Sequence, residues 1–398
     1  MTKICVVGLG YIGLPISALL ANRGFQVHGV DVSQKVVDIV NSGGVHIVEP
    51  GLEEAVNAAV AVGDFVADTK LKAADIFIIA VPTPFKADHV PDLSHVEAAA
   101  NSISDYIQPG NLVIIESTVP VGTTDETVGG ILRSKGHKLG TDVFLAHCPE
   151  RVLPGNIMEE LLANDRVVGG IDELSSRKAE EFYSSFVEGE VIVTNSKTAE
   201  LVKLTENSFR DVNIAFANEI SMIADSEDID PWEVIELANR HPRVQILQPG
   251  PGVGGHCIAV DPWFIVSRSP DIAKLIRTSR EVNNSKPKWI VEKVKFLARK
   301  YDWPTIGCLG LAFKANIDDL RQSPAMGIAR QLVMEKIGDV LVCEPNISTV
   351  ADFELVDLDE VILKSDIILI LVDHKEFLDL NSEKLKGKEL IDTRGIIR

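Results

Sequence analysis

Short apolar runs alternate with helical patterns through the first half of the chain. The runs are rich in β-branched residues and read as buried strands: KICVVGLG, QVHGVDV, DIFIIAV, LVIIES, VFLAHC and VIVT. Amphipathic segments lie between most of them, beginning with YIGLPISALLANRG. Strands that alternate with helices predict a doubly wound α/β domain on a parallel sheet.

The pattern becomes helical near Ser196. Residues 196–229 contain neither glycine nor proline and predict one long helix. A second helix is expected to start at Pro231, with Asp230 as its N-cap. A third helical stretch runs from about residue 272 to about residue 300, and we expect Pro287 to interrupt it.

The alternation returns from about residue 304. TIGCLGLAF, DVLVCEP, DIILILV and KELIDTR read as strands, and PAMGIARQLVMEKIG and DEVILKS as helices between them. We therefore expect two Rossmann-like doubly wound domains joined by a helical central domain with a long connecting helix. The expected domains are residues 1–195, 196–300 and 301–398.

The chain of 398 residues is acidic, with a formal net charge of −19. This charge argues against nucleic acid as a partner, because phosphate backbones bind basic surfaces. If the ligands are anionic, local arginine and lysine side chains must bind them against an unfavourable overall field.

Neither a membrane span nor a signal peptide is expected. The longest apolar runs, IFIIAV and IILILV, are far shorter than the roughly 20 residues of a membrane helix. The start MTKICVVGLG reads as a strand that enters a turn. The five cysteines are scattered and odd in number, which favours a reduced, cytoplasmic protein.

A dinucleotide site is predicted where the first strand meets the first helix. Gly8, Gly10 and Gly13 follow the G-x-G-x-x-G spacing, which allows a tight turn, a close approach to pyrophosphate and close helix packing. Asp31 ends the second strand, where a carboxylate binds the adenosine ribose and repels a 2′-phosphate. NAD is therefore the expected cofactor, and Lys35 could soften this preference.

Polar residues also end two later strands and mark one face of the long helix. Thr83 and Thr118 lie at the sheet edge where ligands collect, although each alone also fits a strand-end cap. Lys203, Asn207 and Arg210 share one helix face. That stripe fits either a solvated face or a site for an anion or a developing oxyanion.

The segment GPGVGGHCIAVDPWF places Cys257 in a glycine-rich loop. A cysteine is usually a small core hydrophobe, but such a loop is a poor place for a core residue. A cation such as Lys203 nearby would favour the reactive thiolate. The pairs of His and Cys in HCPE and GHC are adjacent in sequence, which is awkward for one tetrahedral zinc, so no metal is expected.

Seven motifs follow one another along the chain: GLGYIGLP, VPTP, ESTVPVGTT, CPERVLPG, KLTENSFRDVNIAFANE, GPGVGGHCIAVDPWF and GLAFKANIDDLRQSP. Together they resemble the UDP-glucose/GDP-mannose dehydrogenase family over essentially the whole chain. Ala259 and Val260 stand where the UDP-glucose enzymes typically carry Pro-Lys. Within the family, the resemblance favours UDP-N-acetyl-D-mannosamine as the substrate.

The resemblance implies an NAD-dependent, four-electron oxidation of a sugar C6 alcohol to a carboxylate, for polysaccharide precursors. A first hydride transfer would give an aldehyde, which a cysteine attacks to form a thiohemiacetal. A second hydride transfer would leave a thioester, which water hydrolyses. This chemistry would explain why a dehydrogenase carries a cysteine in a glycine-rich loop.

The catalytic roles are carried over by position from the same resemblance. Cys257 is the expected nucleophile, and Lys203 is a base or an oxyanion partner. Asn207 helps to hold the oxyanion. Glu150 is a candidate for activating water, and Asp261 would orient water or lysine.

The resemblance also implies two sets of binding residues and a UDP-sugar ligand. The nucleotide-sugar set is Arg151, Val152, Lys203, Asn207, Arg210, His241, Arg243, Gly254, Phe313, Lys314 and Arg394. The cofactor set is Gly8, Gly10, Tyr11, Ile12, Gly13, Asp31, Lys35, Thr83, Thr118 and Arg321. Family members dimerise through the helical middle, so we expect a homodimer or a dimer of dimers.

Three alternatives stay open from the sequence. The same chemistry could act on UDP-N-acetylglucosamine, UDP-glucose or GDP-mannose. A one-step hydroxyacid dehydrogenase would share the first lobe but would need neither Cys257 nor a second α/β lobe. A non-catalytic nucleotide-sugar sensor would keep the arginines and could lose Cys257 or Lys203, both of which are present.

Overall fold

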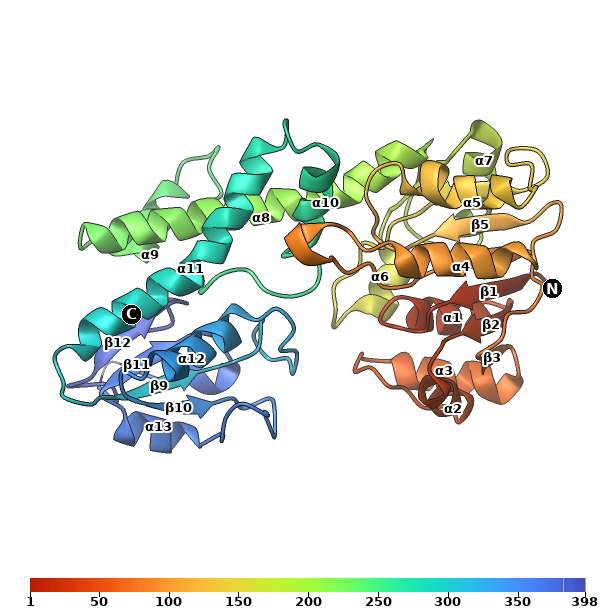
Figure 1. Ribbon diagram of the computed structural model, residues 1–398. Helices are drawn as coiled ribbons and strands as arrows, with labels where there is room; N and C mark the ends of the chain where they lie inside the picture. The colour runs from red at the N-terminus through yellow and green to blue at the C-terminus, as the bar shows by residue number, and fades with distance from the viewer. Residues whose placement is uncertain (382, 398) are drawn as a thin grey trace. The chain divides into compact units, whose positions relative to one another are not determined.

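The computed structural model describes residues 1–381 and 383–397 (Figure 1). The chain divides into two compact units, Met1–Glu206 and Asn207–Arg398. This division falls inside a long helix. The sequence predicted three domains instead of two units, and this three-domain division stays a prediction.

An eight-stranded sheet forms the centre of the first unit. Its strands are β1 (Lys3–Val7), β2 (Gln26–Val30), β3 (Phe65–Asp68), β4 (Ile76–Ile79), β5 (Leu112–Ile115), β6 (Phe144–His147), β7 (Arg166–Gly170) and β8 (Val191–Asn195). They lie in the order β3-β2-β1-β4-β5-β6-β7-β8. The six strands predicted in this half are confirmed, and β3 and β7 were not predicted.

The sheet differs from the expected parallel sheet at one place. β7 pairs antiparallel with β6 through a short ladder, Ala146 opposite Gly170 and His147 opposite Gly169, while β7 and β8 pair in parallel. A Cβ atom on Gly169 would lie 2.3 Å from the carbonyl oxygen of Asn195, so only glycine fits there. The doubly wound architecture is confirmed, with this mixed edge as the difference.

Apolar residues alternate between the two faces of the sheet and build a core on each. Ile4 and Ile78 belong to one core, whereas Cys5, Phe77 and Ile79 belong to the other. Helices cover both faces: α1 (Gly13–Asn22), α2 (Gln34–Asn41), α3 (Leu52–Val62), α4 (Ser94–Ser104), α5 (Gly129–Ser134), α6 (Ile157–Ala163) and α7 (Glu173–Ser184). Two short turns of helix, η1 (Ala87–His89) and η2 (Thr123–Val128), complete this unit.

The helical middle of the chain follows the predicted order. It contains α8 (Ser196–Ser226), α9 (Pro231–Ala238), α10 (Asp261–Arg268) and α11 (Lys274–Ala298). The Asp230 side chain accepts a hydrogen bond from the backbone N–H of Trp232 at 2.9 Å, so the predicted N-cap of α9 is confirmed.

The expected interruption at Pro287 is wrong, because α11 continues through this residue. A proline inside a helix leaves the carbonyl four residues earlier without its helical donor, and here that carbonyl belongs to Asn283. A Cβ atom built on Gly252 would lie 3.2 Å from this oxygen. The backbone of the cysteine loop therefore passes next to the carbonyl that Pro287 leaves without its donor.

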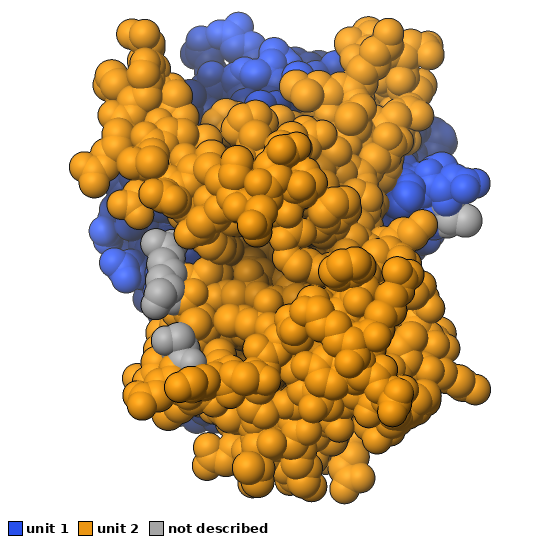
Figure 2. All heavy atoms as spheres, turned by 90° about the vertical axis from the view of Figure 1, so that its left-hand side faces the viewer, with its two compact units in different colours: residues 1–206 blue, residues 207–398 orange. Residues whose placement is uncertain are grey.

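A four-stranded parallel sheet ends the second unit, as predicted. Its strands β9 (Thr305–Leu309), β10 (Asp339–Cys343), β11 (Ile367–Ile370) and β12 (Glu389–Asp392) lie in the order β10-β9-β11-β12. One face packs against α11 and α12 (Pro324–Glu335), and the other against α13 (Leu358–Lys364) and η3 (Lys375–Phe377). Figure 2 shows this unit in orange, with a hollow near the middle of the face turned to the viewer.

Among residues 1–381 and 383–397, no helix has both the length and the apolar character to cross a membrane.

Candidate active site

The predicted glycine turn joins β1 to α1, and each glycine meets a different constraint. Gly8 has a φ of +96°, and a Cβ atom there would lie 2.5 Å from the carbonyl oxygen of Ala80. A Cβ atom on Gly13 would lie 1.7 Å from the carbonyl oxygen of Gly8. A Cβ atom on Gly10 would meet no atom within 4 Å. Gly8 and Gly13 therefore shape the turn, whereas Gly10 leaves open space for a ligand.

This turn lies where the strand order reverses. β1 lies between β2 and β4 in the sheet. The chain passes from β1 to β2 and β3 on one side, and then crosses to β4 and the later strands on the other side. Nucleotides bind at such a switch point, outside the carboxyl ends of the strands. The N-terminus of α1 has no side-chain cap, so its backbone dipole faces the same edge and favours an anion.

Asp31 lies directly after β2 and helps to hold the turn. Its two carboxylate oxygens accept the backbone N–H groups of Leu9 at 3.0 Å and of Ser33 at 2.9 Å. A carboxylate oxygen has room for a second donor, so both oxygens can still accept ribose hydroxyls.

The other predicted cofactor residues of this unit lie around the same edge. Thr83 follows β4 and donates its hydroxyl to the carbonyl of Thr118, after β5, at 2.6 Å. Tyr11 and Ile12 are half-buried in the turn, and Lys35 is exposed on α2. The residues present fit an NAD molecule at this edge.

Glu150, the predicted acid–base residue, is buried after β6. It forms an ion pair with Arg166 of β7, with 3.0 Å between Arg166 Nη1 and Glu150 Oε2. Its other oxygen accepts the backbone N–H of Arg151 at 2.5 Å. Both members of the ion pair are almost completely buried, so Arg166 fixes the direction of the Glu150 carboxyl group.

A second carboxylate faces the same guanidinium. Glu116, after β5, is buried and accepts the hydroxyl of Tyr183 at 2.6 Å. Burial raises the pKa of Glu116 to about 7. The positive charge of Arg166 lowers this pKa and only partly offsets burial, whereas the negative charge of Glu150 raises it further. Sequence analysis missed Arg166, Glu116 and Tyr183. The sequence did contain one signal of this site: Arg166 is a charged residue at the start of the apolar run RVVGG, which indicates a buried charge that needs a partner.

The remaining predicted residues of the first unit lie near its last helix. Arg151 pairs with Glu206 at 2.7 Å and also donates to the carbonyl of Asp165 at 3.0 Å. Val152 is half-buried. Lys203 is half-buried on α8, one turn before Asn207. The roles of these residues toward a nucleotide sugar stay predictions.

In the second unit, Cys257 is exposed, while the other four cysteines of the chain are buried. Gly252 and Gly255, in the same loop, have φ values of +139° and +82°. The loop is fixed at two points before the cysteine. Gly250 donates its N–H to Asn218 Oδ1 at 2.9 Å, and Gly255 donates to the carbonyl of Arg321 at 3.2 Å. The loop therefore presents a surface thiol from an anchored backbone.

A helix starts directly after the cysteine and places a carboxylate beside an amide. The carbonyl of Cys257 accepts the N–H groups of Val260 at 3.0 Å and of Asp261 at 2.8 Å. Asp261, the first residue of α10, accepts Asn207 Nδ2 at 2.5 Å, and both side chains are buried. The structure thus brings together two of the predicted catalytic residues, Asn207 of α8 and Asp261, which lies four residues after Cys257.

A buried polar network between α8 and α11 supports the first anchor. Arg280 and Asp211 are almost completely buried and form an ion pair at 2.6 Å. Asn283 donates to Asp211 at 2.8 Å and accepts from Asn218 at 2.8 Å. Since Asn218 holds Gly250, the network connects the helix pair to the cysteine loop. The polar residues of α8 were visible in the sequence, but their partners on α11 were not.

Several predicted substrate residues of this unit gather at the glycine loop. A Cβ atom on Gly254 would lie 2.8 Å from Phe313 Cβ, and one on Gly250 would lie 2.7 Å from Arg394 Nη1. Arg394 also pairs with Asp373 at 2.8 Å. Other predicted residues are exposed around the unit: Arg210, His241, Arg243, Lys314 and Arg321, of which Arg321 pairs with Asp319.

A cavity of about 320 Å³ lies beside α9 in the same unit. Its walls are formed by Trp232, Ile235, Glu236, Asn239, Arg240 and Gln248. It opens next to the segment that carries His241 and Arg243, which makes it a candidate position for part of a nucleotide ligand.

The two His-Cys pairs weighed as metal ligands in the sequence are placed differently. Burial lowers the pKa of His147 to about 3 and raises the pKa of Cys148 to about 12, so both side chains are neutral. His256 and Cys257 are exposed. Within the described part of the chain, no three His, Cys, Asp or Glu side chains are grouped so that they could hold a metal ion.

A glycine turn with a carboxylate at the end of the second strand, on a doubly wound sheet, is typical of an NAD-binding domain. Residues 2–187, 197–285 and 307–398 match, in turn, the NAD binding, central and UDP binding domains of the UDP-glucose/GDP-mannose dehydrogenase family. The chain belongs to this family. It is an NAD-dependent nucleotide-sugar dehydrogenase, and its substrate is a UDP-sugar.

Individual relatives are similar over nearly their whole length. The chain is 51% identical to an NDP-N-acetyl-D-galactosaminuronic acid dehydrogenase of Ralstonia solanacearum, covering 99% of this chain and 96% of the relative. It is also 51% identical to a UDP-N-acetyl-D-mannosamine dehydrogenase of Salmonella typhimurium, covering 100% and 99%. A solved UDP-D-ManNAc dehydrogenase of Pyrococcus horikoshii has a TM-score of 0.92 and 39% identity, covering 100% and 96%.

The role of Asp31 predicts a change in cofactor preference. Asp31→Ala should weaken NAD binding by about tenfold to a hundredfold, because hydrogen bonds from the ribose to a charged acceptor are lost. It should also narrow the advantage of NAD over NADP. Titration of both cofactors checks this, with Asp68→Ala at the end of β3 as the control. An unchanged preference in Asp31→Ala would refute the ribose contact.

The raised pKa of Glu116 predicts a pH-dependent stability. A carboxyl whose pKa rises from 4.5 to about 7 on folding stabilises the fold below pH 4.5, and this stability is lost as the pH rises through 7. Glu116→Gln stays neutral and should lack this dependence. From roughly pH 5 to pH 8, the wild type should lose about 3 kcal/mol relative to the variant in urea unfolding. Equal pH profiles would contradict the assignment.

Proposed function

We propose that the protein oxidises the C6 primary alcohol of UDP-N-acetyl-D-mannosamine to the carboxylate, in polysaccharide precursor synthesis, through a covalent intermediate on Cys257. The observation that carries the proposal is the anchored loop around Cys257. It holds an exposed thiol on a backbone fixed at Gly250 and Gly255, and the Cys257 carbonyl accepts the N–H of Asp261, whose side chain binds Asn207. A dehydrogenase that works once on each substrate would need no such nucleophile.

The chemistry balances over two oxidations. The alcohol first loses a hydride and a proton to become an aldehyde. The Cys257 thiolate then adds to the aldehyde carbon, and the oxygen takes a proton to give a thiohemiacetal. Loss of a second hydride and a proton leaves a thioester, and water cleaves its C–S bond to release the acid and the thiol. NAD bound at the glycine turn of Gly8, Gly10 and Gly13 would supply the hydride acceptor for each oxidation, so two NAD would be needed for each sugar.

Each predicted catalytic residue has a role in these steps that suits its chemistry. Lys203 would accept the alcohol proton or stabilise an oxyanion, since a lysine can change its protonation readily on burial. Asn207 would donate to the oxyanion while Asp261 holds its amide in place. Glu150, held in place by Arg166, would take the proton of the attacking water.

The binding residues carry the UDP-sugar and the cofactor in the proposal. Arg151, Arg210, Arg243, Lys314 and Arg394 would bind the diphosphate and the sugar, since guanidinium and ammonium groups suit phosphate oxygens. Val152, His241, Gly254 and Phe313 would complete the nucleotide-sugar contacts. Arg321 would contact the cofactor, together with the residues of the glycine turn.

The identity of the sugar is the part of the proposal for which other candidates are most similar. Relatives with the same 51% identity are named for different sugars, one for UDP-N-acetyl-D-mannosamine and one for an NDP-N-acetyl-D-galactosaminuronic acid. Several further relatives, including one of Escherichia coli at 50% identity, are named for the mannosamine substrate. Ala259 and Val260, in place of the Pro-Lys of the UDP-glucose enzymes, argue against UDP-glucose as the substrate.

The proposal extends to the assembly and the compartment. Phe209, Phe216 and Ile223 are seven residues apart on α8, and each is about half exposed or more. Such an apolar stripe favours pairing of α8 with a second copy of the chain, as a dimer or a dimer of dimers. A catalytic thiol must stay reduced, which favours the cytoplasm.

We also assign a separate role to each of the three domains expected from the sequence. Residues 1–195 would bind NAD, residues 196–300 would carry the dimer contact and the cysteine loop, and residues 301–398 would bind the UDP-sugar. The matched family segments support this order.

Counting NADH formed per sugar consumed tests the proposal. The panel comprises UDP-N-acetylmannosamine, UDP-N-acetylgalactosamine, UDP-N-acetylglucosamine, UDP-glucose and GDP-mannose. Two NADH per UDP-N-acetylmannosamine, with little from the others, is the expected result. Two from another sugar would replace the substrate, and one NADH with an aldehyde product would refute the covalent route.

The nucleophile predicts a separate effect of mutation. Cys257→Ser should lower kcat by at least about a thousandfold, because a serine hydroxyl is a far weaker nucleophile at neutral pH, while NAD affinity stays within about twofold. Cys308→Ala, which removes a buried thiol from the second unit, serves as the control and should stay active. Near-normal turnover by Cys257→Ser would contradict the mechanism.

A further inference from the structure

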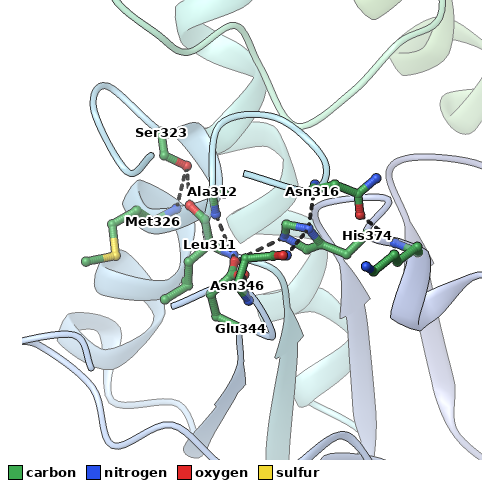
Figure 3. A network of polar contacts seen from close by, with 9 residues as sticks. Leu311, Ala312, Asn316, Ser323, Met326, Glu344, Asn346 and His374 are labelled. Carbon is green, nitrogen blue, oxygen red and sulfur yellow. Dashed lines mark hydrogen bonds and ion pairs between the residues drawn. The ribbon is translucent and has the colours of Figure 1, made fainter. Parts of the chain in front are cut away.

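The segment that carries Phe313 and Lys314 is held by a buried carboxylate of a neighbouring strand. Glu344 directly follows β10, and its side chain is completely buried. One of its oxygens accepts the backbone N–H groups of Leu311 at 2.7 Å and Ala312 at 3.0 Å. The other accepts the N–H of Asn346 at 2.9 Å. Figure 3 shows Glu344 at the centre of these contacts.

A buried histidine extends the same network to the far end of the segment. His374 follows β11, and its Nε2 lies 3.1 Å from the Glu344 carboxylate. Its Nδ1 accepts the backbone N–H of Asn316 at 2.9 Å and lies 2.8 Å from the Asn346 amide nitrogen (Figure 3). Nδ1 faces N–H donors and Nε2 faces a carboxylate, so the ring accepts hydrogen bonds at Nδ1 and donates one from Nε2.

The segment between these anchors needs such support. Asn316 and Gln322 have φ values of +60° and +51°, in the left-handed region that is costly for most residues. Asn316 also accepts the N–H of Lys375 at 2.9 Å through its side chain. Asparagine tolerates this region better than most residues, so the cost falls chiefly on Gln322, whose carbonyl lies beside Gly254.

The same segment lies directly under the cysteine loop. A Cβ atom on Gly254 would lie 2.7 Å from the carbonyl oxygen of Gln322, and one on Gly255 would lie 2.9 Å from the ring of Phe313. Gly255 also donates to the carbonyl of Arg321. A shift of residues 311–322 would therefore displace the backbone two residues before Cys257.

We propose that Glu344 and His374 are positioning residues for the nucleotide sugar, which they serve by holding residues 311–316 so that Phe313 and Lys314 face the ligand and support the cysteine loop. This inference rests on the proposed function, because it assigns that segment to the UDP-sugar. Neither residue touches the reacting atoms. Their effect should appear in binding of the nucleotide and in the mobility of the segment.

The state of the carboxylate supports this role. Burial alone would raise the pKa of Glu344, but hydrogen bonds from His374 and from the N–H groups of Leu311 and Asn346 outweigh burial and hold the pKa at about 2. Glu344 is therefore an ionised acceptor over the whole working pH range. Four donors converge on its two oxygens, which no neutral side chain of the same length can accept.

Substitutions can separate positioning from general stability. Glu344→Gln replaces one carboxylate oxygen by an NH₂ group. This group would face either the N–H groups of Leu311 and Ala312 or the N–H of Asn346, and it cannot accept a hydrogen bond from them. His374→Gln keeps a donor toward Glu344 but removes the acceptor for Asn316, whereas His374→Asn keeps an oxygen near the position of Nδ1. Asp366→Asn is the matched control, because Asp366 accepts the N–H of Thr305 at 2.8 Å at the opposite end of the same sheet.

The measurements use the full chain, with UDP itself as the probe. Calorimetric titration gives the Kd of UDP and of NAD, and amide hydrogen exchange follows residues 311–316 and Gly255. Glu344→Gln and His374→Gln should weaken UDP at least tenfold, leave NAD within about twofold, and speed exchange in these amides. His374→Asn and Asp366→Asn should bind UDP within about threefold of the wild type.

Two results would overturn the proposal. One is a UDP affinity within twofold of the wild type in a folded Glu344→Gln or His374→Gln. The other is an equal loss of UDP affinity in Asp366→Asn. If Glu344→Gln does not fold, the comparison of His374→Gln with His374→Asn decides. UDP binding does not depend on which sugar is oxidised, so a failure of the proposed substrate in the NADH assay leaves this test intact.

Discussion

The close approach of the cysteine-loop backbone to neighbouring segments is the constraint on which the second unit depends. Gly250, Gly254 and Gly255 each lie so near another segment that a Cβ atom would collide with Arg394, Gln322 or Phe313. A loop of larger residues would stand away from these segments and would lose the bond from Gly255 to Arg321. Although glycine is a flexible residue, its lack of a side chain lets this loop pack closely against its neighbours. The loop therefore holds the Cys257 thiol in a fixed position.

Two buried polar networks transmit this constraint to the rest of the unit. The Arg280–Asp211 pair and its asparagines hold the start of the loop from the helices, and Glu344 with His374 supports its underside from the C-terminal sheet. In the first unit, Arg166 does the same for Glu150. Buried charges are costly unless they are paired, so such networks favour one arrangement of the residues that they hold.

The sequence predicted the local features well and the long-range ones poorly. The glycine turn, the α9 cap at Asp230 and most strands depend on neighbouring residues, and the structure confirms them. β7 was missed because RVVGG carries an arginine and two glycines, and only the partner Glu150 makes Arg166 acceptable inside. The anchors of the cysteine loop pair residues far apart in sequence, such as Asp211 with Arg280, whose meeting depends on tertiary packing.

The central claim is that Cys257 carries the substrate between the two oxidations. The most direct measurement is acid quenching of Glu150→Gln during turnover with NAD and UDP-N-acetylmannosamine, followed by mass spectrometry of the intact chain and its peptides. Slow hydrolysis should let the thioester accumulate, so the account predicts an oxidised nucleotide-sugar adduct on the peptide that contains Cys257. Formation of two NADH per sugar with no adduct on that peptide at any quench time would contradict it.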